Sequence, residues 1–393
     1  MQQVAAGHSR PTPDGLSASQ KLDRIRGRVL QLQAHHSDLW DGIREDLATE
    51  GIRIIAPDEW ARHNELRERF IDEIFPVLTP LAVDPSHPFP YISDLSLSLA
   101  VTVRDPATGE RRFARVKVPP ILPRLWEVAP RTYVLLERVI AANLDVLFPG
   151  MEVESHYLFR VTRNADLDIE EDEADDLLLA MEEELRRRRF GAVVRLETER
   201  SMPNETRALL MRGLALDPAN VYEIRGMLDL RGLGIIADLD IPELQPEPWN
   251  PVTPPRLTLR EEEEEEGVDM FARIREGDIL VHHPYESFTT SVQRLVQQAA
   301  EDPDVLTIKM TLYRTSGDSP IVHSLIRAAE SGKQVVVLVE IKARFDERAN
   351  IVWAKALERA GAHVAYGLLG LKTHSKIALI IRRESGGLRR YAH

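Results

Sequence analysis

Two arginines and a histidine recur at equal intervals in the last third of this sequence. Arg314, Arg344 and His374 are spaced 30 residues apart, and an apolar, β-branched run precedes each of them. The interval matches one strand, one helix and two short loops, which is the size of a βαβ step. Such crossovers make consecutive strands parallel, and parallel strands collect ligands at their carboxyl ends. The sequence therefore predicts that these three side chains meet at one edge of a parallel sheet. The predicted strands span residues 305–313, 335–342 and 363–367.

A histidine flanked by cations supports phosphoryl transfer. Neutral imidazole attacks phosphorus and forms a phosphoramidate, which is itself a phosphoryl donor. The step needs cations on the phosphate oxygens while charge moves to the leaving group. Arginine suits this role because its planar fork binds two oxygens and stays protonated. The alternative is structural, since a lone histidine near a strand or a lone surface arginine needs no function. The expected site residues are His374 as nucleophile and Arg314, Arg344 and Lys376 as phosphate ligands, with Lys309, Lys342 and Lys372 nearby.

Composition excludes several classes of protein. The 393 residues are 43% hydrophobic, which is enough for two or three domains with cores of their own. The absence of cysteine excludes disulfides, thiolate metal sites and cysteine nucleophiles, and it fits the reducing cytoplasm, where we expect the protein. The formal net charge of −13 argues against nucleic-acid binding. No apolar run approaches the ~18 residues of a membrane span, and the first residues lack a signal-peptide core.

Three common catalytic motifs are also missing from the sequence. There is no Gly-x-x-x-x-Gly-Lys-Ser/Thr loop, no Gly-x-Ser-x-Gly elbow and no His-Glu-x-x-His zinc motif. These absences argue against a P-loop enzyme, an α/β-hydrolase and a zinc protease. The pattern around His374 is therefore the remaining candidate for a catalytic site.

The chain divides into segments of different composition and periodicity. Residues 1–15 are polar and proline-bearing, which indicates a disordered lead-in, and helical periodicity at 16–83 predicts a partial helical domain. Strands and helices intermix at 84–241, which predicts an α+β head domain. A proline-dense linker at 242–267 precedes an α/β catalytic domain at 268–393. The expected fold class is therefore multidomain, with α+β architecture followed by α/β.

Apolar periodicity gives the individual elements. Residues 95–101 alternate with period two, which predicts a half-buried strand, and residues 113–118 complete a hairpin with it. The other predicted strands are 157–163, 192–197 and 278–281, and the predicted helices are 18–49, 58–74, 136–147, 173–189, 204–214, 219–230 and 287–300. Between the predicted parallel strands, Ser319–Pro320 signals a helix start, and Gly332 and Gly361 signal helix ends.

Several stretches of the sequence carry a family resemblance. They are residues 87–93, 159–166, 276–285, 287–288, 309–314, 342–347, 349–351, 370–376 and 390–393. In these stretches the chain resembles polyphosphate kinases of the first type, a family with phospholipase-D-like catalytic domains. The similarity runs from about residue 25 to the last residue and is most specific in the final third.

The resemblance implies an ATP–polyphosphate phosphotransferase that moves the terminal phosphate of ATP, reversibly, to polyphosphate through a phosphohistidine. It implies ATP, ADP and inorganic polyphosphate as ligands, Mg²⁺ as cofactor and a homodimer or higher homo-oligomer. His374 matches the phosphorylated residue, and His393 matches a second histidine of the motif region, a further catalytic candidate. Arg314 and Arg344 match residues assigned to magnesium. We interpret them as phosphate ligands, because arginine has no lone pair for a metal.

A second group of cations lies in the head segment. The resemblance makes these residues candidates for guiding polyphosphate, and the alternative is a solvated strand face. They are Arg104, Arg111, Arg112, Arg115 and Lys117.

The resemblance also implies that this chain is truncated at both ends. Family members begin with an additional helical stretch that contacts adenine, and they continue into a second phospholipase-D-like domain. We therefore expect a fragment whose kinase activity alone is weak or absent. The alternative is a non-catalytic, truncated paralogue that binds polyphosphate or pairs with a full-length subunit. Hydrolysis of the phospholipase D type is disfavoured, because His374-x-Lys376 lacks the following aspartate and has no second copy.

Overall fold

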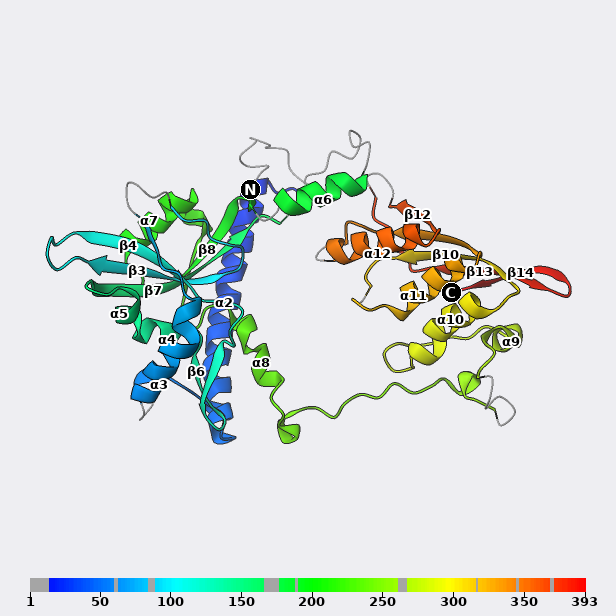
Figure 1. Ribbon diagram of the computed structural model, residues 1–393, viewed down its shortest axis with the longest axis horizontal. Coiled ribbons are helices and arrows are strands. Elements are labelled where there is room, and N and C mark those ends of the chain that lie inside the picture. The colour runs from blue at the N-terminus through cyan, green and yellow to red at the C-terminus, as the bar shows by residue number, and fades with distance from the viewer. Residues whose placement is uncertain are drawn as a thin grey trace. The chain divides into compact units, whose positions relative to one another are not determined.

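The computed structural model forms two compact units (Figure 1). The first unit is Met1–Asp166 with Arg188–Glu243, and the second is Leu167–Arg187 with Leu244–His393. The residues that the structure describes are 14–59, 63–83, 89–165, 177–187, 190–260, 267–315, 317–343, 346–367 and 371–393.

A mixed sheet forms the centre of the first unit. Its strands, in order across the sheet, are β2 (Leu81–Val83), β4 (Arg111–Lys117), β3 (Leu97–Arg104), β7 (Glu152–Arg163), β8 (Val193–Glu199) and β9 (Val221–Ile224). Neighbours are antiparallel except β8 and β9, which are parallel. The predicted β3–β4 hairpin is confirmed. The half-buried prediction for β3 is wrong, because Leu99 and Ala100 pack into apolar clusters on opposite faces.

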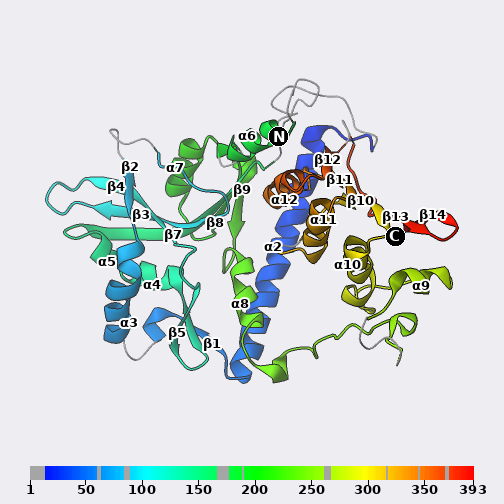
Figure 2. The ribbon, with the colours of Figure 1, turned by 45° about the vertical axis from the view of Figure 1, so that its right-hand side comes forward.

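Helices surround this sheet, and the longest is α2 (Ala18–Thr49), the blue helix in Figures 1 and 2. It begins with a capping box in which Ser17 and Gln20 each bond the other's backbone amide. The other helices are α3 (His63–Arg69), α4 (Leu136–Ala142), α5 (Leu144–Leu147), α7 (Asn204–Leu214) and α8 (Gly234–Ala237). A small second sheet, which the sequence did not predict, has the order β1 (Arg53–Ile55), β6 (Thr132–Leu135) and β5 (Leu125–Ala129).

Two helix predictions in the first unit need correction. The helix predicted at 219–230 is wrong, because residues Val221–Ile224 form β9 and extend the sheet beside β8. The helix predicted at 136–147 is broken at Asn143, where the backbone leaves the helical region between α4 and α5.

The second unit contains the predicted parallel strands. The order across its sheet is β12 (His363–Tyr366), β11 (Gln334–Val339), β10 (Val305–Leu312), β13 (Ala378–Glu384) and β14 (Gly387–Ala392). Strands β10, β11 and β12 are parallel, as predicted. Strand β13 runs antiparallel to β10, and β14 runs antiparallel to β13. The carboxyl ends of β10 to β12 therefore share an edge with the start of β13.

Two crossover helices connect the parallel strands and lie side by side in both views (Figures 1 and 2). They are α11 (Pro320–Glu330) and α12 (Glu347–Arg359). The predicted cap is present, because the hydroxyl of Ser319 accepts from the amide of Val322 at 3.5 Å. Gly332 and Gly361 follow the two helices with φ of +86° and +90°, which favour glycine.

The second unit also includes α6 (Leu177–Arg187), α9 (Met270–Arg275) and α10 (Arg294–Glu301). The helix predicted at 287–300 starts as a π-helical turn, Thr289–Gln293, and continues as α10. The strand predicted at 278–281 does not form. Apolar side chains from β10, β11, α11 and α12 make the core, and Ile308, Val337, Val322 and Leu357 are each 0% exposed. No helix in the described residues has the length and hydrophobicity that a bilayer crossing needs.

Candidate functional site

The candidate site lies at the carboxyl edge of the second unit's parallel strands. Arg314 comes two residues after β10, and His374 comes four residues before β13. Because Met310 on β10 pairs with Ala378 on β13, both side chains belong to the same edge. Arg344 lies outside the described residues, so its place beside them stays a prediction.

The ring of Tyr313 brings three of the site's charged or nucleophilic groups together. The imidazole of His374 lies edge-on to this ring, with centroids 5.3 Å apart and planes at 73°. The ammonium of Lys376 is 4.2 Å from the centre of the same ring, and the Cζ of Arg314 is 5.8 Å from it. Both cations are within the range of a cation–π contact. Three of the expected site residues, Arg314, His374 and Lys376, therefore lie around Tyr313.

Hydrogen bonds fix the loop that carries His374. The hydroxyl of Thr311 on β10 donates to the carbonyl of Ser375 at 2.7 Å and accepts from the amide of Ile377 at 2.9 Å. The amide of Thr373 donates to the carboxylate of Glu340 at 2.7 Å. The loop is thus held on both sides of an exposed imidazole.

An aspartate orients the guanidinium of Arg314. Its Nε donates to the Oδ2 of Asp346 at 2.7 Å, and 60% of the arginine side chain is exposed. Asp346 is the residue before α12. The start of that helix therefore determines the orientation of the Arg314 guanidinium. The contact with Asp346 orients Arg314 while the arginine side chain stays accessible to a ligand.

Two further lysines add positive charge at this edge. The ammonium of Lys372 donates to the carbonyl of Lys342 at 3.1 Å. Burial and, second, the charge of Lys372 lower the pKa of Lys342. Their mutual repulsion would be relieved by an anion that lies between them. Lys309 is also exposed, on β10.

His393 lies on the same edge but has different surroundings. Its backbone pairs with Ala378 in both directions, at 2.8 and 2.9 Å. Its side chain lines a cavity of about 140 Å³ with Ser291 and Asp278. Burial and, second, the nearby His283 lower the pKa of His393. No described contact joins His393 to His374, so its catalytic role stays a prediction.

The described residues do not form a magnesium cage. Among the described residues, no group of three or more histidine, aspartate or glutamate side chains could hold a metal ion. Mg²⁺ prefers several oxygen ligands, and the carboxylate of Asp346 is bound to Arg314. The site is instead cationic, which suits an anion.

The basic residues of β3 and β4 are mostly neutralised within the first unit. Arg104 and Arg111 pair with Glu154 at 3.2 and 2.8 Å, and Arg112 pairs with Glu110 at 2.8 Å. Arg115 is only 5% exposed, and burial lowers its pKa to about 10. Arg115 is therefore no part of a solvated strand face, and the guiding role predicted for this group stays untested.

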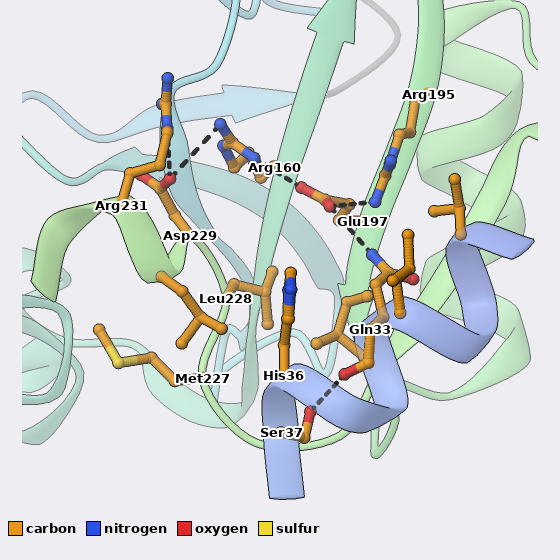
Figure 3. Close-up of a pocket in the computed structure, with 14 residues that line it drawn as sticks. Gln33, His36, Ser37, Arg160, Arg195, Glu197, Met227, Leu228, Asp229 and Arg231 are labelled. Carbon is orange, nitrogen blue, oxygen red and sulfur yellow. Dashed lines mark hydrogen bonds and ion pairs between the residues drawn. The ribbon is translucent and has the colours of Figure 1, made fainter. Parts of the chain in front are cut away.

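A cavity of about 320 Å³ lies elsewhere in the first unit, where α2 faces β8 (Figure 3). His36 points into it, and charges of opposite sign alternate along its wall. Arg160 pairs with Glu197 at 2.9 Å and with Asp229 at 3.4 Å, and Arg195 pairs with Glu197 at 2.5 Å. Glu197 is shared between Arg160 and Arg195, and Asp229 is shared between Arg160 and Arg231, so ion pairing neutralises most of the positive charge that a phosphate ligand would meet in this cavity. The sequence did not predict it.

Comparison with known proteins gives consistent matches for both units. The polyphosphate kinase middle domain family matches residues 61–236, and the polyphosphate kinase C-terminal domain 1 family matches residues 269–393. A polyphosphate kinase of Streptomyces coelicolor is 54% identical over 99% of this chain and 52% of its own length. One of Synechocystis sp. is 53% identical over 100% of this chain and 57% of its own. The crystal structure of polyphosphate kinase from Porphyromonas gingivalis superimposes with a TM-score of 0.76 at 30% identity, covering 99% of this chain and 55% of that one. The chain thus spans about half the length of the curated relatives it matches.

Proposed function

Because this chain belongs to the polyphosphate kinase family, we propose that it carries the phosphate-accepting site of an ATP–polyphosphate phosphotransferase. The observation that supports this most is the exposed imidazole of His374 beside the cations of Arg314 and Lys376 on one tyrosine ring. The substrates we propose are ATP or ADP and inorganic polyphosphate.

In the proposed reaction His374 is the nucleophile. An imidazole nitrogen forms a bond to the γ-phosphorus of ATP, while the bond from that phosphorus to the β–γ bridging oxygen breaks and ADP leaves with the electron pair. A terminal phosphate oxygen of polyphosphate then attacks the phosphohistidine. The phosphorus–nitrogen bond breaks, and the imidazole regains its electron pair. Both steps are reversible.

The cations are proposed to stabilise the transferred phosphoryl group. Charge on its equatorial oxygens and on the leaving oxygen needs donors that are already oriented. The contact with Asp346 orients Arg314, and the carbonyl of His374 accepts from Lys376 at 2.5 Å. Magnesium is proposed to arrive on the phosphates, since the described side chains form no cage for it. We also propose Arg344 as a second phosphate-binding arginine and His393 as a further catalytic residue.

Finer features of organisation are proposed from family membership. These are a phospholipase-D-like fold for residues 268–393, a head domain at 84–241, a homodimeric or higher state and a cytoplasmic location. The match of separate family domains to residues 61–236 and 269–393 supports the proposed division into a head domain and a catalytic domain.

Labelling with ³²P-polyphosphate and Mg²⁺ tests the proposed nucleophile. Polyphosphate donates the phosphoryl group directly, so the test does not require an adenine pocket. We expect acid-labile, alkali-stable label on the chain and none on the His374→Ala variant. His363→Ala is the matched control, because His363 begins β12 at the opposite edge of the same sheet. Label that persists in His374→Ala would refute the assignment, and salt-sensitive polyphosphate binding without any label would favour a binding module.

A further inference from the structure

We propose that Glu340 and Asn350 form a clamp that positions the phosphate-accepting loop against the arginine-bearing loop. Neither residue is expected to touch the substrate, so both are positioning residues. The inference rests on the proposed function only in taking His374 as the phosphate acceptor.

Glu340 uses one carboxylate oxygen to bond the loop before β13 and the other to bond its own loop, two residues further along the chain. It follows β11 directly and is 2% exposed. Its Oε2 accepts from the amide of Thr373 at 2.7 Å, and its Oε1 accepts from the amide of Lys342 at 2.9 Å. Among the described residues, no lysine or arginine forms an ion pair with this carboxylate. Its charge is therefore compensated by backbone amides of fixed direction.

Asn350 extends the clamp from the first turn of α12. It is 1% exposed, and its Nδ2 donates to the carbonyl of Tyr313 at 2.7 Å and to the carbonyl of Glu340 at 2.8 Å. The amide of Glu340 in turn donates to the carbonyl of Leu312 at 2.9 Å. The ends of β10 and β11 and the loop before β13 are thus joined through two buried side chains.

The clamp acts on the residues that directly precede the functional ones. Thr373 precedes His374, and Tyr313 precedes Arg314. A shift of either backbone group therefore moves the imidazole or the guanidinium by a similar amount. Misplacement by about 1 Å can reduce a rate ~10²-fold.

A purely structural role would not require a charged residue at position 340. Burying a carboxylate costs free energy unless hydrogen bonds compensate it, and apolar replacements of buried charges are often neutral or stabilising. A carboxylate is suited to this place because it accepts from two amides at once, whereas a carboxamide offers only one oxygen. The need to hold two loops at a set separation explains the residue type.

Glu340→Gln tests the clamp while keeping the shape of the side chain. We expect the rate of His374 phosphorylation from ³²P-polyphosphate to fall about 10²-fold per folded molecule. The half-saturating polyphosphate concentration should stay close to that of the unmodified chain, because the cations remain. Glu384→Gln is the matched control, since Glu384 ends β13 at the opposite edge of the same sheet. A Glu340→Gln chain that labels at the unmodified rate, or loses label only as it loses folded protein, would overturn the inference.

Amide hydrogen exchange gives a readout that does not depend on catalysis. In the unmodified chain, the amides of Thr373 and Lys342 should exchange slowly although both belong to loops, and in Glu340→Gln one or both should exchange faster. Exchange of both amides at the unprotected rate in the unmodified chain would also overturn the clamp. Phosphate found on a residue other than His374 would instead refute the proposed function and leave the exchange result to decide the clamp.

Discussion

At the scale of single residues, Tyr313 explains why the candidate site is compact. The rings of Tyr313 and His374 meet at 73°, and the cations of Lys376, from the same loop as His374, and of Arg314, the next residue after Tyr313, lie 4.2 and 5.8 Å from the centre of the tyrosine ring. The tyrosine ring therefore contacts the proposed nucleophile and two of the proposed phosphate ligands. The tyrosine itself needs no chemical role beyond this.

Arg314 offers a direct test of the proposed phosphate clamp. We expect Arg314→Ala to lower the rate of His374 phosphorylation by roughly 10²–10³, the typical effect of losing one oriented donor. Arg314→Lys should recover little of this, because an ammonium cannot bind two oxygens in a plane. Initial rates with ³²P-polyphosphate measure both variants. Arg383→Lys, at the far end of β13, is the control. Equal rates for all three variants would exclude a role of Arg314 in binding the phosphate.

The lowered pKa of Lys342 predicts that its contribution to the stability of the fold depends on pH with a defined sign. Burial and the charge of Lys372 hold its pKa below the ordinary value of 10.5, so it loses its proton at a lower pH than a free lysine. The folded chain then binds fewer protons than the unfolded chain between the lowered pKa and 10.5, and this group's contribution to stability rises with pH across that window.

Side-chain NMR titration of Lys342 checks this prediction. We expect Lys372→Met to raise the pKa of Lys342 only partway, because burial, the larger cause, remains. Lys309→Met, which removes an exposed lysine on β10, should leave it unchanged. A pKa at or above that of a free lysine in the unmodified chain would contradict the interpretation.

The functional residues that sequence could predict share one property. Arg314, His374 and Lys376 follow or precede strands whose patterns are clear, so topology alone brings them to one edge. Glu340 and Asn350 could not be found this way. Their partners are backbone amides and carbonyls up to 37 residues away, and such contacts leave no periodic signal.

At the scale of elements, the sequence pattern predicted a helix or strand correctly where the tertiary contacts favour the same structure. The strands β10 and β11 are rich in β-branched residues, and the side chains of Val305, Ile308, Val335 and Val337 are buried in the core of the second unit. The helix predicted at 219–230 failed because pairing with β8 outweighs its helical periodicity. The strand predicted at 278–281 failed because no described strand pairs with it.

The packing of α12 on the sheet predicts a large mutational effect. Leu357 is 0% exposed in the core of the second unit, so Leu357→Ala should lower the free energy of unfolding by about 2–5 kcal/mol. Leu388 is 63% exposed on β14, and Leu388→Ala should change it by less than ~0.5 kcal/mol. Denaturant titration of both variants measures the difference. Equal effects would show that α12 does not pack as described.

At the scale of the whole chain, the positive charge of the candidate edge is opposite in sign to the net charge of the protein. The formal net charge is −13, yet the candidate edge presents Arg314, Lys342, Lys372 and Lys376. A polyanion must therefore be drawn by this edge against an unfavourable overall field. Composition could exclude a general nucleic-acid binder, but it could not reveal the cationic edge, because folding brings these residues together from three loops.

The position of the phosphate on the labelled chain is the most direct test of the central claim. After exposure of the unmodified chain to polyphosphate and Mg²⁺, peptide mapping by mass spectrometry at alkaline pH would locate the modified residue. We expect a single phosphohistidine at His374. Phosphate on His393 or on any other residue, with His374 unmodified, would contradict the proposed mechanism.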